Sequence, residues 1–157
     1  MSGLTLTIQA EGFDRVFRGL RLLEQAGQDP SPFLQDAGEY MLRSTLHRWR
    51  AEIDPKGQPW AALSPAYALG KGSKKGGVNK ILQLRGRLIK SVHWGIHGKT
   101  LFLGTNVVYS RIHQEGGKAG RGLKVLIPAR PFLGFSDENK RRLVHLVNEH
   151  LRAALGG

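Results

Sequence analysis

Histidines and acidic residues are the side chains of this 157-residue chain best suited to bind a metal or transfer protons. His93 and His97 have the spacing of four that places two zinc ligands on one face of a helix. Gly95 and the alternating apolar residues around it instead indicate a strand, in which positions four apart lie roughly 13 Å from each other. His145 and Glu149 fit a solvated pair on a helix surface. We therefore expect no metal site.

The sequence Gly98-Lys99-Thr100 is similar to the end of a phosphate-binding loop. Such a loop needs another glycine five positions before Gly98 and a helix directly after it. Here the earlier position is His93, and Leu101-Phe102-Leu103 is typical of a strand. The acidic residues lie mainly in expected helix first turns and on solvated faces, and the chain has no cysteine. We predict no catalytic residue, no cofactor and no enzymatic activity.

Positive charge dominates the composition, because 24 Lys and Arg face 12 Asp and Glu, for a formal net charge of +12 and a pI near 10.6. Such a surface attracts polyanions, so nucleic acid and a neutral-to-acidic protein are both candidate partners. Two glycine-rich stretches, near 70–79 and 116–123, are predicted to be flexible basic loops. Their predicted contacts to DNA or to an acidic partner are Lys71, Lys74, Lys75, Lys118 and Arg121.

Gly117-Lys118-Ala119-Gly120 has the Gly-x-x-Gly form with which KH domains clamp a nucleic-acid backbone. The loop of a KH domain connects two helices, whereas the residues from Leu123 to Ile127 are typical of a strand. A flexible basic loop is therefore the favoured interpretation of this stretch.

The first part of the chain predicts one strand followed by two helices. Residues 4–8 alternate between apolar and polar, which indicates a half-buried strand. Apolar residues from Phe13 to Leu23 recur at helical spacing, and Gly27 is suited to end that helix. Ser31 is the expected N-cap of a second helix. A proline-containing loop ends this helix, and Trp60 in that loop is expected to be buried in the core. The apolar stripe of this helix consists of Leu42, Leu46, Trp49 and Ile53.

The rest of the chain predicts a short helix over 81–92, a β-hairpin over 92–103 and one or two helical turns over 109–115. A further strand contains Val125 and Ile127, and Ser136 caps the last helix, which ends at Gly156. The apolar face of that helix comprises Leu143, Val144, Val147, Leu151 and Leu155.

Together these elements predict an α+β fold in which a small, mainly antiparallel sheet packs against long N- and C-terminal helices. The length fits one domain over residues 1–157, burying about 70% of the surface of the unfolded chain. The sequence starts without a secretion signal, and no apolar run approaches the roughly 20 residues that cross a bilayer. We expect a soluble protein made in the cytoplasm, with no membrane partner.

Two segments predict an interaction surface rather than a reaction centre. In residues 127–134 two prolines restrict the backbone around an arginine, and two large apolar residues follow. A backbone fixed before binding loses less entropy on binding, and the apolar side chains are suited to fill a neighbour's pocket. Residues 109–116 line the adjoining surface or hold this corner together. The predicted subunit interface comprises Tyr109, His113, Gln114, Pro128, Arg130, Pro131, Phe132 and Leu133.

Four motifs follow one another between Pro55 and Ser136. They are Pro55-x-Gly57-x-Pro59-Trp60-x-x-Leu63-Ser64, Ile81-Leu82-x-x-x-Gly86-x-Leu88-x-x-Ser91-Val92, Gly104-Thr105-Asn106-x-x-Tyr109-x-x-Ile112-His113-Gln114-x-Gly116 and Ile127-Pro128-Ala129-Arg130-Pro131-Phe132-Leu133-Gly134-x-Ser136. In this order they resemble the phage virion morphogenesis family, the tail-completion proteins of Mu-like and related contractile-tailed phages. Ser110 stands where alanine is expected in that family, which is a small departure.

The resemblance implies a non-enzymatic structural protein that acts late in virion assembly, in tail completion and head-tail joining. Related head-tail connectors and tail terminators commonly assemble as rings, often of six, around the DNA channel. The resemblance therefore implies a fold like theirs, a homo-oligomeric ring, and contacts with other neck and tail proteins and with genomic DNA. Its expected location is the neck or tail of the virion, and the host cytoplasm during assembly. The alternatives are a stand-alone basic nucleic-acid-binding protein and, less favoured, a small virion hydrolase.

Overall fold

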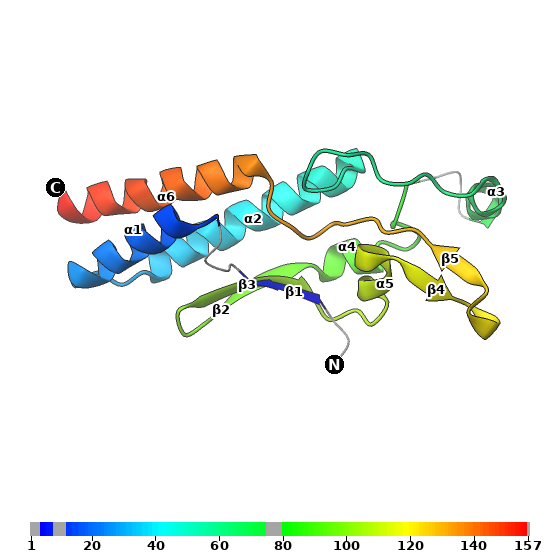
Figure 1. Cartoon of the computed structure of the whole chain (residues 1–157), viewed down its shortest axis with the longest axis horizontal. Helices are drawn as coiled ribbons and strands as arrows, with labels where there is room; N and C mark the ends of the chain where they lie inside the picture. The colour runs from blue at the N-terminus through cyan, green and yellow to red at the C-terminus, as the bar shows by residue number, and fades with distance from the viewer. Residues whose placement is uncertain (1–3, 8–11, 75–79, 157) are drawn as a thin grey trace.

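The computed structural model describes residues 4–7, 12–74 and 80–156. Figure 1 shows the three longest helices towards one end of the molecule and the β4–β5 hairpin with α3 at the other. The fold class is α+β, as predicted. The elements in chain order are β1 (Leu4–Thr7), α1 (Asp14–Gln25), α2 (Ser31–Ala51), α3 (Pro65–Lys74), α4 (Arg87–Ser91), β2 (His93–His97), β3 (Thr100–Thr105), α5 (Ser110–Glu115), β4 (Gly117–Ala119), the 3-10 turn η1 (Arg121–Leu123), β5 (Val125–Ile127) and α6 (Asp137–Leu155).

The main sheet has three antiparallel strands in the order β1-β3-β2. β2 and β3 form the predicted hairpin, in which Trp94 pairs with Leu103. β1 pairs with the other edge of β3 and places Leu6 opposite the same Leu103. Leu101 and Leu103 are buried, so the alternating pattern marks a sheet with one face on the core.

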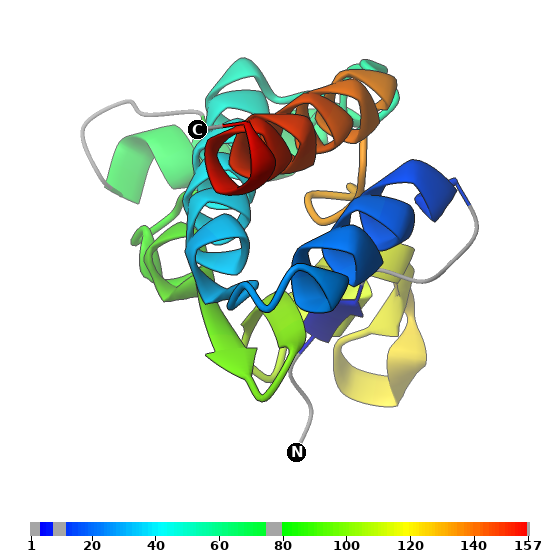
Figure 2. The same ribbon diagram turned by 90° about the vertical axis from the view of Figure 1, so that its left-hand side faces the viewer.

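A layer of three helices packs on this sheet. α1 and α2 each contact α6, and α2 also lies across β2 and β3, an arrangement that Figure 2 shows from the helical end. The predicted apolar face of α1 is buried or half-buried along its whole length. Gly19 lets α1 approach α6 closely, because a Cβ added there would lie 2.7 Å from Val147 Cγ2. Helix packing thus depends on one small residue in α1.

The second helix begins differently from the prediction. Ser31 is its first helical residue, and Pro30 holds the cap position. The Asp29 carboxylate accepts hydrogen bonds from Ser31 N–H (3.0 Å) and Ser31 Oγ (2.7 Å), and these bonds hold the pKa of Asp29 below its usual value. The predicted stripe is confirmed in part, since Trp49 is fully buried and Leu42 and Leu46 are half-buried. Ile53 is also half-buried but lies beyond the end of α2, in a β-bridge with Pro59.

Aromatic side chains connect the helical layer to the segment that precedes α6. The Trp49 ring lies edge-on to Trp60, with centroids 5.6 Å apart, and 4.7 Å from the Phe132 ring. All three side chains are buried. Trp60 Nε1 donates a hydrogen bond to the carbonyl of Pro131 (2.8 Å). Trp60 is therefore the core anchor that the sequence predicts.

α6 begins at the predicted cap. Ser136 Oγ accepts from Asn139 N–H (3.0 Å), and Asn139 Oδ1 accepts from Ser136 N–H (2.9 Å), which forms a reciprocal cap. Arg48 reaches from α2 to donate to Asn139 Oδ1 (2.8 Å) and to the Gly134 carbonyl (3.0 Å). At the other end of α6 the prediction is wrong for Leu155, which is 62% exposed because the helix extends beyond the core.

The helix predicted over 81–92 is wrong in its first half. Only α4 is helical there, because Leu82 (φ +58°) and Gly86 (φ +68°) have left-handed backbone that interrupts an α-helix. Leu88 is buried as expected, but Leu84 is 45% exposed. The spacing of apolar residues in this segment therefore reflects a turn followed by a short helix.

Both stretches predicted to be flexible loops contain regular structure. Residues 70–74 belong to α3, and residues 75–79 lie outside the described part of the chain. In the second stretch β4 pairs antiparallel with β5, with η1 between them. β5 is thus a strand, as predicted, but it belongs to a second sheet of two strands instead of the main sheet. Gly116 allows the backbone at Ala129 to lie close to it, because a Cβ added to Gly116 would lie 2.8 Å from the backbone nitrogen of Ala129.

Candidate functional site: an apolar groove beside α5

α5 carries Gln114, whose side chain holds the segment before α6 in place. Gln114 Oε1 accepts hydrogen bonds from the N–H groups of Phe132 and Leu133, each at 3.0 Å. Gln114 Nε2 donates to the carbonyl of Leu133 at 2.8 Å. The side-chain amide thus pairs with the backbone as a neighbouring strand does. This short helix therefore fixes the path of residues 132–133.

Arg130 connects three segments of the chain. Its N–H donates to the carbonyl of His113 (2.7 Å). Its guanidinium donates from Nε to the carbonyl of Ala61 (2.7 Å) and from Nη2 to that of Ala62 (3.0 Å). The side chain is 6% exposed, and this burial lowers the pKa of Arg130. Because the side-chain bonds go to neutral carbonyl groups, they orient the guanidinium and leave its positive charge uncompensated.

Several residues of the predicted subunit interface are buried within the chain. Phe132, Leu133 and Arg130 are 1%, 5% and 6% exposed. They lie in the chain's own core, so in this conformation they have no surface with which to fill a neighbour's pocket. Gln114 and Pro131 are half-buried and hydrogen-bonded to the same region. The proline-braced segment therefore holds the fold together.

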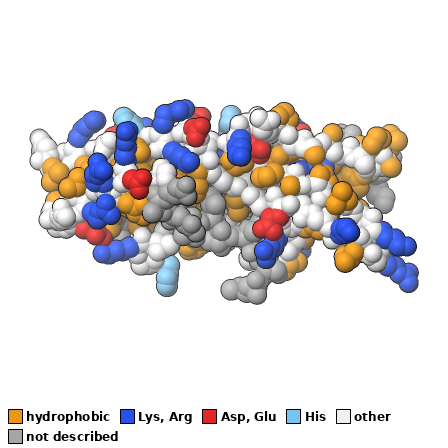
Figure 3. Space-filling model, viewed as in Figure 1, with side chains coloured by type: hydrophobic (Ala, Val, Ile, Leu, Met, Phe, Trp, Pro, Cys, Tyr) orange, Lys and Arg blue, Asp and Glu red, His pale blue; other side chains and the backbone are white. Residues whose placement is uncertain are grey.

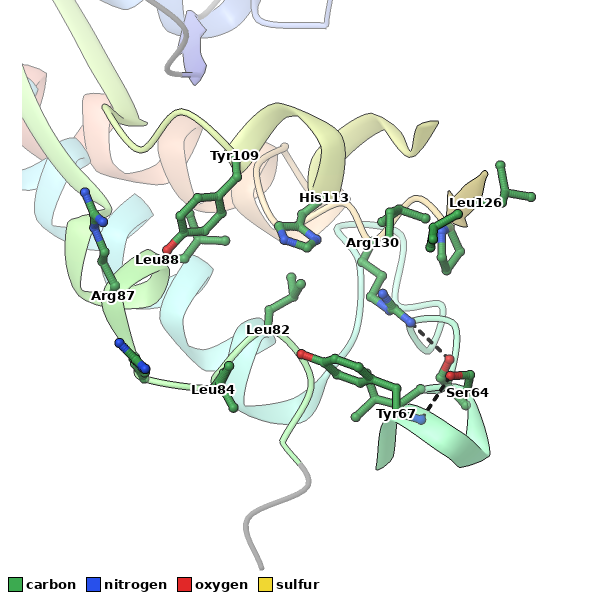
Figure 4. A pocket seen from close by; sticks show the side chains of 17 residues that line it. Ser64, Tyr67, Leu82, Leu84, Arg87, Leu88, Tyr109, His113, Leu126 and Arg130 are labelled. Carbon is green, nitrogen blue, oxygen red and sulfur yellow. Dashed lines mark hydrogen bonds between the residues drawn. The ribbon is translucent and has the colours of Figure 1, made fainter. Parts of the chain in front are cut away.

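Three other predicted interface residues, Tyr109, His113 and Pro128, keep accessible surface. Tyr109 is 39% exposed, and its ring meets that of His113 edge-on with centroids 6.0 Å apart. Burial, and secondly the charge of Arg130, lower the pKa of His113, which favours the neutral form of this imidazole. His113 Nδ1 has no hydrogen-bond partner among the described residues. Figure 4 shows both rings at the wall of one cavity.

That cavity is a groove of about 670 Å³, which is within the size range of ligand-binding pockets. Its walls are residues 62–67, residues 82–88, the start of α5, and residues 125–130 (Figure 4). These four segments are distant in the sequence, and tertiary packing alone brings them together. The side chains that line the groove are mainly apolar and include Tyr67, Leu82, Leu84, Tyr109, Leu126 and Pro128.

Leu82 occupies the centre of this site in a strained conformation. Its side chain points into the groove (Figure 4), and its backbone φ is +58°. A left-handed backbone at a residue other than glycine costs about 1–3 kcal/mol, and such strain gathers at functional sites. The preceding N–H, of Ile81, donates to Glu52 Oε1 at 2.8 Å. This contact with the end of α2 helps to hold the segment in place.

Charge is distributed unevenly along the chain. Residues 55–136, which supply every residue of the groove, contain 14 Lys and Arg but one acidic residue, Glu115. The remaining residues contain 10 Lys and Arg and 11 Asp and Glu. Glu115 itself pairs with Arg111 at 3.1 Å. In Figure 3 apolar side chains gather at the groove end of the molecule, with cations at its tip. Counting charge by segment, instead of over the whole chain, is the signal that would have located this end.

The predicted contacts to DNA or to an acidic partner fall into two groups. Lys118 in β4 and Arg121 in η1 are exposed on the β4–β5 hairpin. The side chains of Lys71 and Lys74 in α3, and the whole of Lys75, lie outside the described residues. Lys118 and Arg121 do not line the groove. The structure therefore places these two cations on the hairpin surface.

The histidines are arranged as their spacing indicates. His93 and His97 lie on strand β2, and His145 forms the expected surface pair with Glu149 at 3.1 Å. Among the described residues, no group of three metal-binding side chains comes together. The groove offers apolar side chains, guanidinium groups and the imidazole of His113, and pockets of this composition are typical of binding sites.

Comparison with known proteins identifies the family of the chain. Residues 9–152 match the sequence profile of the phage virion morphogenesis family. The chain belongs to this family. The match includes α1, α2, most of α6 and every residue of the groove. The resemblance carried by the four motifs between Pro55 and Ser136 is confirmed.

Two relatives of this family member are proteins of Mu-like elements. Over 65 residues the chain is 38% identical to "Mu-like prophage FluMu G protein 2" of Haemophilus influenzae, covering 41% of this chain and 47% of that protein. Over 117 residues it is 26% identical to "Putative capsid assembly protein G" of Escherichia phage Mu, covering 73% and 75%. The chain thus spans about half the length of the first relative. No solved structure matches the chain.

Family membership associates the protein with the morphogenesis of phage virions. Within the described residues, no helix combines the length and the apolar character that a bilayer span requires.

Proposed function

We propose that this member of the phage virion morphogenesis family completes the phage tail and enables the head to be joined to it, without catalysing a reaction. It acts as a ring of identical subunits at the neck or tail end. Membership of the family supports the assembly role, and the relative from phage Mu is named a putative capsid assembly protein. A protein that works by contact needs exposed apolar surface, and this chain carries such surface at the groove end.

The observation that supports a ring is the exposure and backbone conformation of Leu123 at the tip of the β4–β5 hairpin. Its side chain is 63% exposed, and its backbone φ is +53°. This left-handed conformation costs about 1–3 kcal/mol for leucine. Packing within the chain offsets little of that cost, because most of the side chain is in solvent. Burial against a neighbouring subunit would contribute about 2 kcal/mol.

A projecting hairpin that docks on a different surface of the next copy forms a heterologous interface. Such an interface closes into a ring when the rotation between neighbours permits it, and the family resemblance favours six copies. A standard interface buries about 1,600 Å² in total, of which the hairpin supplies one side. Lys118 and Arg121 lie on the same hairpin and are suited to face DNA in the channel of the ring.

Native mass spectrometry and negative-stain microscopy of the purified protein test the ring. We expect closed rings of the wild-type protein at high concentration and monomers of the Leu123→Ser variant. Leu155→Ser is the matched control, because Leu155 is 62% exposed at the opposite end of the molecule. Its rings should persist. A wild-type protein that stays monomeric at high concentration contradicts the ring.

A stand-alone nucleic-acid-binding protein is the second candidate function, and the hairpin cations favour it. Lys118, Arg121 and Lys124 are exposed, and residues 116–136 contain no acidic side chain. This function requires tight binding to free duplex DNA, with log affinity falling by about 0.9 per neutralised phosphate for each tenfold rise in salt. Lys118→Ala and Arg121→Ala should each reduce that slope by about 1. Weak binding by the monomeric Leu123→Ser variant would count against it.

A further inference from the structure

The chain leaves the groove open, and its walls remain apolar in solvent. Tyr67, Leu84 and Leu126 line it while 51%, 45% and 74% of each side chain is exposed. Monomeric proteins seldom expose apolar side chains contiguously unless the patch binds something. Strain at Leu82, whose side chain enters the same space, adds a second independent feature of a functional site.

The rim of the groove is positive. Arg85 and Arg87 flank Gly86 on one wall, both are exposed, and neither side chain has a hydrogen bond or ion pair with another described residue. Arg130 adds a guanidinium that is bonded to carbonyl groups. No carboxylate is among the residues that line the groove. An occupant that carries negative charge therefore gains attraction at this rim.

We propose that the groove binds an acidic, apolar segment of another virion protein. Carboxylates of that segment pair with Arg85 and Arg87, and its large apolar side chains pack against Leu82, Leu84 and Tyr109. Helix-in-groove recognition has this form, with apolar anchors at positions i, i+3, i+4 and i+7. The inference rests on the proposed role in virion assembly and adds to it the chemistry of the partner.

The described residues of a second copy do not supply that chemistry. The described residues include eleven acidic side chains, and eight of them bond to groups of their own chain, among them Glu24 with Lys99 and Asp36 with His150. The other three lie in the first turns of α1 and α6. The exposed apolar residues of these two helices, Leu22 and Leu155, lie two or more turns away from those carboxylates. Leu123 at the hairpin tip does not line the groove, although Leu126 of the same hairpin does.

Nucleic acid fits the groove less well than such a segment. Duplex DNA is held chiefly through its phosphates, which need a broad cationic surface. Here Leu and Tyr side chains occupy the interior, and the free cations lie only on the rim. Lys118 and Arg121, the exposed hairpin cations, lie outside the groove. The observations favour a protein segment.

Fluorescence anisotropy with two synthetic peptides tests the proposal on the full-length protein. The first peptide has Leu at the i, i+3, i+4 and i+7 positions and Glu at most others, and the second has Lys in place of every Glu. We expect the Glu peptide to bind at least about tenfold more tightly than the Lys peptide, and the difference to shrink as salt is raised. Equal binding of the two peptides, or no binding of the Glu peptide at about 1 mM, overturns the proposal.

Variants then locate the binding surface. The double variant Arg85→Glu/Arg87→Glu should weaken binding of the Glu peptide by about tenfold or more, and Leu84→Ser should also weaken it. Arg15→Glu/Arg18→Glu is the matched control, because both arginines are exposed on α1, away from the groove. Its affinity should equal that of the wild type. Thermal unfolding of each variant verifies that it is folded.

Two other occupants give distinct results. A DNA duplex that displaces the Glu peptide and loses affinity in the Arg85→Glu/Arg87→Glu variant identifies nucleic acid as the occupant, which overturns the proposal. Rings that dissociate in that double variant identify the groove as a contact between copies, with the same consequence. The groove inference and the proposed function can be wrong independently. If neither peptide binds, but rings form and the protein restores infectivity to a deletion phage, the groove inference is wrong and the proposed function is still supported.

Discussion

Gln114 forms hydrogen bonds with both backbone groups of Leu133, since its Oε1 accepts from the N–H at 3.0 Å and its Nε2 donates to the carbonyl at 2.8 Å. One side chain therefore satisfies the polar groups of a residue that is 5% exposed. The same short helix places His113 at the groove, so this clamp also determines where one groove wall stands relative to the core.

Replacing Gln114 with alanine should lower the free energy of unfolding by about 2–4 kcal/mol. The change leaves the N–H groups of Phe132 and Leu133 and one carbonyl without partners, and an unsatisfied buried polar group costs about 1–3 kcal/mol. Urea denaturation measures the difference. Gln35→Ala is the matched control, because Gln35 is exposed on α2 and its loss should change stability by less than about 0.5 kcal/mol. Equal stabilities of the two variants would refute the clamp.

Arg130→Lys should destabilise the protein by about 1–2 kcal/mol although it keeps the charge. Lysine carries a point charge in place of a planar fork, so it cannot reproduce the two bonds to the carbonyl groups of Ala61 and Ala62. Chemical denaturation measures the loss, with Arg121→Lys as an exposed control that should be nearly neutral. A neutral Arg130→Lys variant would show that charge alone is needed at this position.

Gly19→Ala should destabilise the protein by about 1–3 kcal/mol, although alanine is the better helix former. The added Cβ would lie 2.7 Å from Val147 Cγ2, and Val147 is fully buried in α6. Truncating the neighbour makes room, so the loss in the double variant Gly19→Ala/Val147→Ala should be smaller than the sum of the single losses. Additive losses in this cycle would mean that the two helices do not meet as described.

Lowering the pH should reduce stability through His113. A histidine in the unfolded chain has a pKa of about 6.5, and burial followed by the charge of Arg130 lowers the pKa of His113 in the folded protein. Between these two values the unfolded chain binds more protons, so this contribution is complete above about pH 6.5 and is lost as the pH falls towards the folded value. The stability advantage of the wild type over His113→Gln should therefore decrease as the pH is lowered from about 6.5. A difference in unfolding free energy that stays constant from pH 8 to pH 5 contradicts this role of His113.

Local patterns predicted the elements whose pairing partners are near in sequence. The β2–β3 hairpin follows from alternation on both sides of His97-Gly98-Lys99, and the cap at Ser136 follows from its position before a helical stretch. The prediction of a helix over 81–92 was wrong in its first half because a contact with a distant residue influences the backbone conformation there. The Glu52 carboxylate binds the N–H of Ile81, next to the left-handed Leu82.

The candidate site was predictable only in part. The residue types at 109–116 and 127–134 predicted an interaction surface. Phe132 and Leu133 instead point into the core, where Phe132 packs against Trp49, which in turn packs against Trp60. Glycine near 116 indicated a loop, whereas the close approach of Ala129 requires a residue without a side chain there. The groove itself joins four separate segments, and no local pattern encodes such an arrangement.

The most direct test of a structural role in tail completion is microscopy and titration of particles from a phage that lacks this gene. The account predicts separate heads and tails and a large loss of infectivity, both restored when the wild-type protein is supplied from a plasmid. Leu123→Ser should fail to restore them, and Leu155→Ser should succeed. Normally joined particles with full infectivity in the absence of the protein would contradict the account.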